Sequence, residues 1–309
     1  MSEGIITKGV GGTYTVRNKE GNLLSCMIRG KIRNKSKIPC IGDIVDYESS
    51  GDPDIPYVIV GIKPRKNYLV RPPIANVDYL FLSFAVKDPE PDLKLLDKML
   101  IICAILKITP YIIFTKADLD RSEAERLHKI YSDAGYRCFI SSLDNPASEK
   151  DIFKGIENSL IAFAGPSGVG KSTMCNAILN REDEEALEVG EVSERLKRGK
   201  HTTRHVELFR HDDSDNDITD TPGFTSLSLL ELGIGYDEIV CGYPELIKAS
   251  EGCKFDDCRH INEKNCNVLS LLKNGDIIDC GRYERYKEFY QETYDNRNNF
   301  SIKVIKWRD

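Results

Sequence analysis

Apolar positions along the first 70 residues recur in short runs of the length expected for β-strands. Five such runs cover Gly4–Val10, Thr13–Arg17, Leu23–Arg29, Asp43–Glu48 and Tyr57–Ile62. Glycine-rich or polar turns separate them. Five short strands in a segment of this size are typical of a small barrel of the OB type. We therefore expect residues 1–68 to form an OB-type β-barrel domain.

Farther along the chain, apolar strand-like runs alternate with helical patterns. Strands are predicted at 77–86, 110–114, 137–141, 160–164, 206–209 and 217–220, and helices at Leu93–Leu106, Ser122–Tyr136 and Lys150–Glu157. This alternation predicts a parallel sheet covered on both faces by helices, an α/β domain spanning 69–228. The segment Asn67–Asn76 holds Arg71-Pro72-Pro73 and is predicted to be a linker.

The pattern changes again after residue 226. Short helices, a cluster of cysteine and histidine, and a tyrosine-rich amphipathic helix at Tyr283–Tyr294 predict a third, mostly α-helical domain at 229–309. The longest apolar run, Met99 to Leu106, is too short to span a membrane, and no signal peptide is recognisable. We therefore expect a cytoplasmic protein with no membrane association.

Charge is distributed unevenly. The net charge is −6, but residues 1–72 carry 12 Lys and Arg against 7 Asp and Glu, a net charge of +5. Five of these cations lie in nine residues, from Arg29 to Lys37. On the rim of a barrel such a run would bind phosphates of RNA, whereas the alternative is a solvated charged loop.

The strand-like run Leu160–Ala164 is followed by G-x-x-x-x-G-K-S and then by a helical pattern, the context of a phosphate-binding P-loop. Its glycines let backbone N–H groups turn toward phosphate oxygens, and the helix N-terminus adds its positive dipole end. Lys171 is expected to reach the β- and γ-phosphates, and the Ser172 hydroxyl to bind Mg²⁺. The candidate nucleotide-binding residues are Gly165, Pro166, Ser167, Gly168, Val169, Gly170, Lys171, Ser172 and Thr173.

A second motif, Asp220-Thr221-Pro222-Gly223, has the form D-x-x-G and follows a predicted strand about 50 residues after the P-loop. In P-loop enzymes this aspartate supports Mg²⁺, and the glycine N–H contacts the γ-phosphate. Between the two motifs lie His201, Thr202 and Thr203, where a threonine could complete the Mg²⁺ shell. Thr203 is the preferred candidate over Thr202.

The base is specified by Thr115-Lys116-Ala117-Asp118, which follows a predicted strand and matches the guanine-selective N/T-K-x-D pattern. The Asp118 carboxylate is expected to accept two hydrogen bonds from guanine, which adenine cannot donate. Thr115 departs from the commoner asparagine. Ser141 and Ser142, at the end of the next strand, are candidates to place a main-chain N–H against guanine O6.

Four metal-binding side chains are spaced closely near the C-terminus, in the order Cys253-x₄-Cys258-x-His260-x₅-Cys266. Three thiolates and one imidazole favour one tetrahedral Zn²⁺ in a closed structural site. The other seven cysteines show no such spacing and are expected to be buried thiols.

In most GTPases the guanine motif follows the P-loop, whereas here it precedes it. In this rotated order of motifs the sequence resembles the circularly permuted GTPases. A parallel sheet tolerates the rotation because permutation preserves the packed core. The basic β-domain, the segment Arg71–Asp78 and the Cys/His cluster make it similar to the ribosome small subunit-dependent GTPase A family. This resemblance implies a GTPase acting in late maturation of the 30S subunit, and it carries the same four zinc ligands.

Hydrolysis also requires a group that orients water, and the position after D-x-x-G holds Phe224, which cannot do so. Intrinsic turnover is therefore expected to be slow, stimulated by the subunit and coupled to release. His201 is a candidate for the missing group, and a surface histidine is the alternative. Expected partners are the 30S subunit and 16S rRNA, with the protein itself a monomer.

Two other functions are alternatives to this interpretation. In one, the protein is an rRNA-binding or remodelling factor whose affinity is controlled by nucleotide, with hydrolysis secondary. In the other it is a P-loop kinase, which is disfavoured because no lid arginine cluster is visible and the guanine motif would serve no purpose with ATP. Hydrolysis measured with and without 30S subunits distinguishes the first alternative from a subunit-stimulated GTPase. Competition by ATP distinguishes the second alternative from a GTPase.

Overall fold

The computed structural model describes residues 1–29, 38–52, 55–179, 206–211, 214–221, 227–274 and 278–298. The chain forms two compact units, each built from two separate segments. The first unit combines Met1–Tyr79 with Phe153–Phe224, and the second combines Leu80–Ile152 with Thr225–Asp309. The OB-type segment therefore shares a unit with the P-loop, and the C-terminal helical region shares a unit with the guanine motif.

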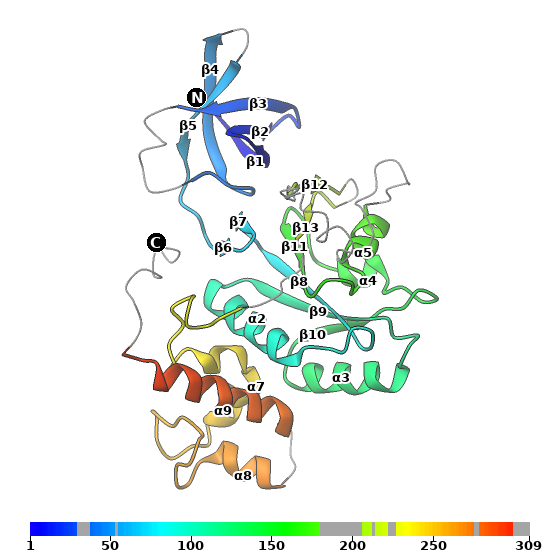
Figure 1. The fold of residues 1–309 in the computed structure, drawn as a ribbon, viewed down its shortest axis with the longest axis vertical. Coiled ribbons are helices and arrows are strands. Elements are labelled where there is room, and N and C mark those ends of the chain that lie inside the picture. The colour runs from blue at the N-terminus through cyan, green and yellow to red at the C-terminus, as the bar shows by residue number, and fades with distance from the viewer. Residues whose placement is uncertain are drawn as a thin grey trace, which may run out of the picture. The chain divides into compact units, whose positions relative to one another are not determined.

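The N-terminal segment is a closed five-stranded barrel with strand order β1-β2-β3-β5-β4, which confirms the expected OB-type fold (Figure 1). Its interior is apolar, and Ile6, Val16, Val45 and Ile59 are fully buried there. The strands are β1 (Ser2–Val10), β2 (Thr13–Asn18), β3 (Leu23–Ile28), β4 (Ile44–Asp52) and β5 (Ile55–Ile62).

The segment expected to be a linker is instead an ordered hairpin of β6 (Tyr68–Val70) and β7 (Pro73–Ala75). The reason is burial, since Ile74 and Ala75 have no exposed surface. The Asn67 side chain bonds both the N–H and the C=O of Val77, at 2.9 and 2.7 Å, and so fixes the chain after the hairpin.

In the first unit, three strands pair in the order β11-β13-β12. Strand β11 (Leu160–Ala164) runs parallel to β13 (Asp217–Asp220), as predicted. The edge strand β12 (Phe209–Arg210) is antiparallel to β13. The sheet is therefore mixed, whereas a parallel sheet was predicted. Helix α5 (Lys171–Ile178) packs against β11 and β13.

In the second unit, three strands pair in the order β10-β9-β8, and helices pack against them. Helix α2 begins where the Asp92 carboxylate accepts the N–H of Leu95 and ends at Lys107, which has a left-handed backbone. The helix predicted at Lys150–Glu157 is shorter in the structure, where α4 covers only four residues, Glu149–Ile152. The elements are β8 (Tyr79–Ala85), α2 (Leu93–Leu106), β9 (Thr109–Thr115), α3 (Arg121–Asp133), β10 (Arg137–Ile140) and α4 (Glu149–Ile152).

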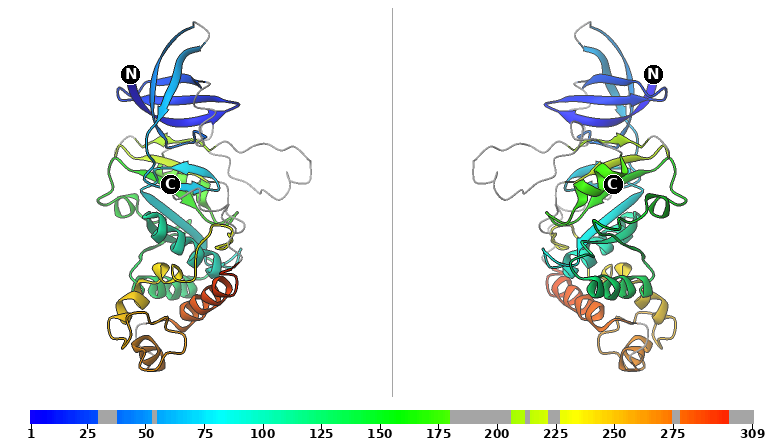
Figure 2. Two further views of the ribbon diagram at one scale, coloured as in Figure 1. Left: turned by 90° about the vertical axis from the view of Figure 1, so that its left-hand side faces the viewer. Right: turned by 90° about the vertical axis from the view of Figure 1, so that its right-hand side faces the viewer.

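The C-terminal part of the second unit is helical, as expected (Figure 2). Its longest helix, α9, packs on η2 and on α2. None of the helices in the described residues has the length and apolar character needed to cross a membrane. The elements are the 3₁₀ helix η2 (Ile239–Gly242), α7 (Pro244–Ser250), α8 (Asn267–Asn274) and α9 (Cys280–Asp295).

Candidate nucleotide and metal sites

The P-loop occupies the turn between β11 and α5, as its sequence context predicts. Gly168 and Gly170 have φ angles of +78° and +88°, a region that glycine enters without strain. Lys171 is only 6% exposed, and its Nζ donates a hydrogen bond to the Pro166 carbonyl at 2.6 Å. The loop therefore holds its own lysine in place, and the N-terminal N–H groups of α5 begin at this residue.

Asp220, the first residue of the D-x-x-G motif, lies beside the P-loop. Ser172 Oγ donates to Asp220 Oδ2 at 2.6 Å, which joins residues 48 positions apart in the sequence. The next residue, Thr221, is anchored to β11 because its hydroxyl donates to the Phe163 carbonyl at 2.6 Å. The hydroxyl and the carboxylate expected to support Mg²⁺ thus lie in contact at the end of strand β13.

Several predicted positions lie outside the described residues. These are His201, Thr202, Thr203, Gly223 and Phe224, together with residues 30–37 of the cationic run. Arg29, at the start of that run, is described, and its Nη1 lies 2.8 Å from Glu48 Oε1.

The guanine motif is held between β9, β10 and the start of α3. The Ala117 N–H donates to the Ser141 carbonyl at 3.2 Å, so the motif and the serine strand end meet as expected. Lys116 has a positive φ of 55°, and its Nζ donates to the Asp88 carbonyl. Thr115 is buried, whereas Asp118 is exposed. The carboxylate that would read the base therefore faces solvent from a braced loop.

The end of this loop is set by the cap of helix α3. Asp120 accepts the Glu123 N–H at 3.0 Å, the hydrogen bond that starts the helix. This backbone contact lowers the pKa of Asp120. The cap thereby fixes where the chain leaves Asp118.

The serine strand end makes its own hydrogen bonds. The Ser141 N–H donates to the Phe114 carbonyl at 2.9 Å, and the Ser142 N–H donates to the Asn145 carbonyl at 3.1 Å. The hydroxyls take part as well, since Ser141 Oγ accepts the Ala147 N–H at 3.1 Å. Both serines are thus committed to shaping the loop, and a guanine contact by the Ser142 N–H requires the Asn145 turn to change.

The four predicted metal-binding side chains come together in the second unit. The Sγ atoms of Cys253, Cys258 and Cys266 and the His260 ring nitrogen all lie within 4.8 Å of one another, so the group could hold a metal ion. Cys253 Sγ lies 3.8 Å from Cys266 Sγ, and His260 Nδ1 lies 3.6 and 3.5 Å from these two atoms. The sequence spacing therefore identified a real cluster.

Two of the four side chains, His260 and Cys253, favour the protonation state that binds metals, whereas burial raises the pKa of Cys258 and Cys266. Burial lowers the pKa of His260, which favours the neutral imidazole that binds metals. Burial raises the pKa of Cys253, but the N–H groups of Val268 and Asn267, together with hydrogen bonds to the Cys266 and Cys258 side chains, bring that pKa below its usual value. The first turn of α8 thus promotes a thiolate at this position.

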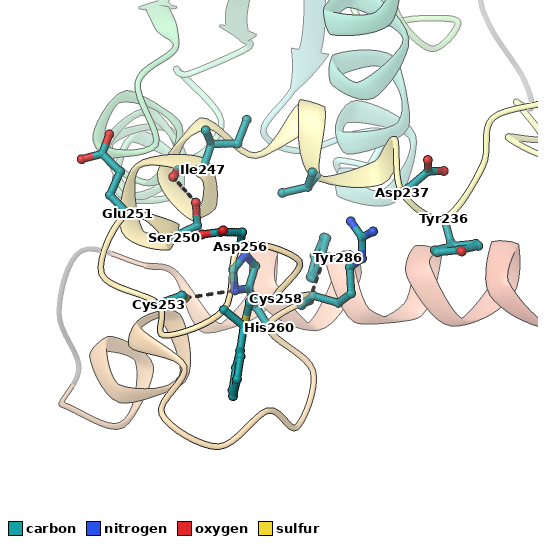
Figure 3. A pocket seen from close by; sticks show the side chains of 13 residues that line it. Tyr236, Asp237, Ile247, Ser250, Glu251, Cys253, Asp256, Cys258, His260 and Tyr286 are labelled. Carbon is teal, nitrogen blue, oxygen red and sulfur yellow. Dashed lines mark hydrogen bonds between the residues drawn. The ribbon is translucent and has the colours of Figure 1, made fainter.

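Surrounding groups fix the loop that carries the ligands. Glu263 accepts the N–H groups of Arg259 and Ile261, both at 2.8 Å, and Tyr283 Oη donates to the His260 carbonyl at 2.7 Å. Beside the cluster a hollow of about 380 Å³ is bordered by Cys253, Cys258 and His260 together with Tyr286 (Figure 3). Three of the four ligands therefore border a depression in the surface.

The remaining cysteines differ from the expectation that all seven are buried. Cys26, Cys40, Cys103 and Cys175 are buried, Cys138 is half-buried, and Cys241 and Cys280 are exposed. The two exposed thiols lie in η2 and at the start of α9.

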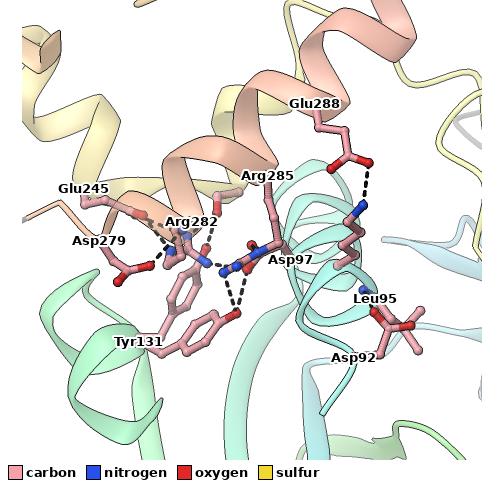
Figure 4. A network of polar contacts seen from close by, with 12 residues as sticks. Asp92, Leu95, Asp97, Tyr131, Glu245, Asp279, Arg282, Arg285 and Glu288 are labelled. Carbon is pink, nitrogen blue, oxygen red and sulfur yellow. Dashed lines mark hydrogen bonds and ion pairs between the residues drawn. The ribbon is translucent and has the colours of Figure 1, made fainter. Parts of the chain in front are cut away.

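The second unit also contains a buried ion-pair network that was not predicted from the sequence (Figure 4). Arg282 of α9 is fully buried, and its Nη1 and Nε lie 2.5 and 2.6 Å from Asp97 Oδ1 and Glu245 Oε1. Burial alone lowers the pKa of Arg282, but the two carboxylates hold it well above its usual value. The available signal was Asp97 itself, a charged residue on the apolar face of the predicted helix Leu93–Leu106.

A nucleotide-binding α/β sheet with a P-loop, a guanine motif placed before it in sequence, an OB-type barrel and a Cys/His cluster together define a circularly permuted GTPase. Residues 62–230 match the RsgA GTPase family and residues 3–54 match the RsgA N-terminal domain. The chain belongs to the RsgA GTPase family.

Relatives and solved structures agree with this assignment. The small ribosomal subunit biogenesis GTPase RsgA of Caldanaerobacter subterraneus subsp. tengcongensis is 38% identical over 94% of this chain and 95% of its own length. The protein of the same name from Ruminiclostridium cellulolyticum is 38% identical over 99% of this chain and 100% of its own length. The crystal structure of YloQ, described as a circularly permuted GTPase, superposes with a TM-score of 0.75, 32% identity and 96% coverage of both chains. The crystal structure of YjeQ from Thermotoga maritima superposes with a TM-score of 0.76 and 28% identity, and the match covers 95% of this chain and 98% of that one.

Proposed function

We propose that this GTPase hydrolyses GTP to GDP and phosphate during late maturation of the small ribosomal subunit, and that the subunit stimulates the reaction. The observation that carries the hydrolytic part is the contact of Ser172 Oγ with Asp220 Oδ2, which joins the P-loop to the D-x-x-G motif. The biological part is supported by relatives named for small ribosomal subunit biogenesis that match over nearly the full length.

The roles of the P-loop side follow from phosphate chemistry. The backbone N–H groups of Gly165–Thr173, apart from Pro166, which has none, bind the phosphates, and Lys171 gives its ammonium to the β- and γ-phosphates. Mg²⁺, when bound, neutralises charge on those phosphates, and Ser172, Thr203 and Asp220 are the residues that hold it. Gly223 contacts the γ-phosphate through its N–H and so responds to hydrolysis.

The guanine side selects the base. Asp118 accepts two hydrogen bonds from guanine, Lys116 lies along the ring, and Thr115 and Ala117 fix the loop. The contact of the Ala117 N–H with the Ser141 carbonyl supports this role, because it ties the loop to the strand end carrying Ser141 and Ser142. A misplaced carboxylate would not discriminate between guanine and adenine.

Slow intrinsic turnover is part of the proposal. Phe224 replaces a water-orienting side chain, so hydrolysis depends on a partner or on His201. Stimulation by the 30S subunit supplies what the isolated site lacks, and hydrolysis then releases the protein from the subunit.

The Cys/His cluster is proposed to hold one structural Zn²⁺. Zinc–sulfur and zinc–nitrogen bonds of about 2.3 and 2.0 Å in a tetrahedron place two sulfurs about 3.8 Å apart, and a sulfur and a nitrogen about 3.5 Å apart. The observed Cys253–Cys266 and Cys266–His260 separations are 3.8 and 3.5 Å. Three of the four side chains already lie near these distances, and Cys258 Sγ lies within 4.8 Å of their ligand atoms, which suits a structural site.

Three domains are proposed, with the OB barrel at 1–68, the permuted GTPase domain at 69–228 and the zinc domain at 229–309. The barrel carries the cationic run and is proposed to bind 16S rRNA, supported by the net charge of +5 over residues 1–72. The protein is proposed to act as a cytoplasmic monomer.

The test is a GTP hydrolysis assay with purified 30S subunits, 50S subunits or free 16S rRNA. We expect stimulation by 30S alone, no competition by excess ATP, and tighter 30S binding with a non-hydrolysable GTP analogue than with GDP. A rate that 30S leaves unchanged would show that the protein is not a subunit-stimulated GTPase. Equal 30S affinity in both nucleotide states would remove release as the purpose of hydrolysis.

A further inference from the structure

Strand β1 of the barrel contains a bulge that faces the GTPase part of the first unit. Its ladder with β2 pairs Ile6 with Val16 and then Lys8 with Thr15, so Thr7 is the extra residue. A bulged residue leaves part of its backbone outside the ladder. Here the Thr7 carbonyl accepts the N–H of Leu208 at 2.9 Å. The irregularity in β1 thus makes a backbone connection to the chain just before β12.

Two ion pairs reinforce this connection. Lys8 and Glu207 form an isolated antiparallel β-bridge, and Lys8 Nζ lies 2.6 Å from Glu207 Oε2. Arg17 of β2 places Nη2 at 2.5 Å from Asp217 Oδ2, with side chains only 14% and 9% exposed. The second pair is thus largely shielded from water, and an ion pair in such a setting is screened little by salt.

The two contacted segments border the hydrolytic residues. Asp217 is the first residue of β13 and Asp220 the last. A strand of this length spans only about 10 Å. Its backbone is paired with β11 on one side and with β12 on the other, so one end cannot shift alone. Glu207 lies four positions after Thr203, the proposed Mg²⁺ ligand.

We infer that Lys8 and Arg17 are positioning residues of the GTPase reaction. They hold the segment 206–208 and the start of β13 against the barrel, so that a partner bound to the barrel acts on Asp220 through β13. The barrel is then part of the device by which the subunit stimulates hydrolysis, in addition to being an anchor. This inference rests on the proposed stimulation by the 30S subunit.

The more exposed of the two pairs, Lys8 and Glu207, allows a charge-swap test. Lys8→Glu and Glu207→Lys each place like charges together, and the double variant restores an opposite pair in reversed order. We expect each single variant to reduce the stimulation factor, the ratio of kcat with saturating 30S to kcat without it, roughly 3- to 10-fold. The double variant should regain most of the factor. Lys19→Glu is the matched control, because Lys19 is a 75% exposed barrel residue that pairs with Glu3.

The shielded pair gives a second measurement. Arg17→Lys keeps the charge, whereas Arg17→Met removes it, so the stimulation factor should fall more in the second variant while both keep the wild-type KM for GTP. Kd for 30S, measured in parallel, separates coupling from anchoring. Single variants that keep the wild-type factor would overturn the inference, as would a loss confined to 30S affinity that the double swap fails to restore. A wild-type factor of one would instead overturn the proposed function.

Discussion

Arg282 in α9 and Asp97 in α2 form an ion pair in which neither side chain has any exposed surface. Arg282 Nη1 lies 2.5 Å from Asp97 Oδ1, across a sequence separation of 185 residues. Glu245 neutralises the other edge of the guanidinium, and Arg285 Nε lies 2.5 Å from Asp97 Oδ2. The network joins the helical C-terminal region to the helices beside the guanine motif, within one compact unit.

Arg282→Met should lower the free energy of unfolding by about 3–5 kcal/mol, because it leaves Glu245 and part of Asp97 buried without a counter-charge. Urea denaturation followed by circular dichroism measures the change. Lys94→Met is the matched control, since Lys94 pairs with Glu288 between the same two helices but both are about half exposed. It should cost only about 0.5 kcal/mol. Equal destabilisation by the two variants would contradict a structural role for the buried network.

Asp118→Asn should weaken GTP binding by at least about 2 kcal/mol, because a carboxylate that accepts two hydrogen bonds is lost. The asparagine amide can donate to the C2 carbonyl of xanthine, so binding of xanthosine triphosphate should improve. Asp120→Asn is the control, since asparagine is also a good helix cap and the residue lies two positions away. Titration calorimetry with both nucleotides measures the exchange. An unchanged GTP affinity in the Asp118 variant would remove the guanine assignment.

Metal analysis should find one zinc per chain. Because three ligands border a surface depression, a chelator should remove the ion, with loss of helical signal from residues 240–309. Cys258→Ser should lower the zinc content and the thermal stability, whereas Cys280→Ser, at an exposed thiol outside the cluster, should change neither. A zinc-free protein with unaltered helix content would show that the site is not structural.

Replacing Lys31, Arg33 and Lys35 together by Glu should weaken 30S association and reduce its salt dependence, because fewer counterions are released on binding. GTP affinity should remain at the wild-type value. The control reverses three exposed lysines far from the barrel in sequence, Lys129, Lys150 and Lys154. Filter binding at several salt concentrations measures both effects. If the two triple variants bind 30S alike, the cationic run is only a solvated loop.

The sequence by itself determined the elements and the motifs. The strand Leu160–Ala164, the helix Leu93–Leu106 and the strand Asp217–Asp220 occur at the predicted residues, because their apolar patterns are strong and their ends carry loop signals. The Cys/His cluster and the guanine motif were also predictable, since their chemistry depends on residue type at fixed short spacings. Where the apolar signal was short and interrupted by proline, at Ile74, the sequence predicted a linker in place of a buried hairpin.

Tertiary structure alone decided which distant residues meet. Nothing local in the sequence pairs Arg282 with Asp97 or Arg17 with Asp217, because such pairs depend on which helix or strand packs beside which. Burial makes the difference, since the same charged residues in water would contribute little, whereas in the interior each requires its partner. The sequence therefore predicts the chemistry of this GTPase. Tertiary packing determines that the barrel contacts the strand bearing Asp220 and that α9 contacts α2.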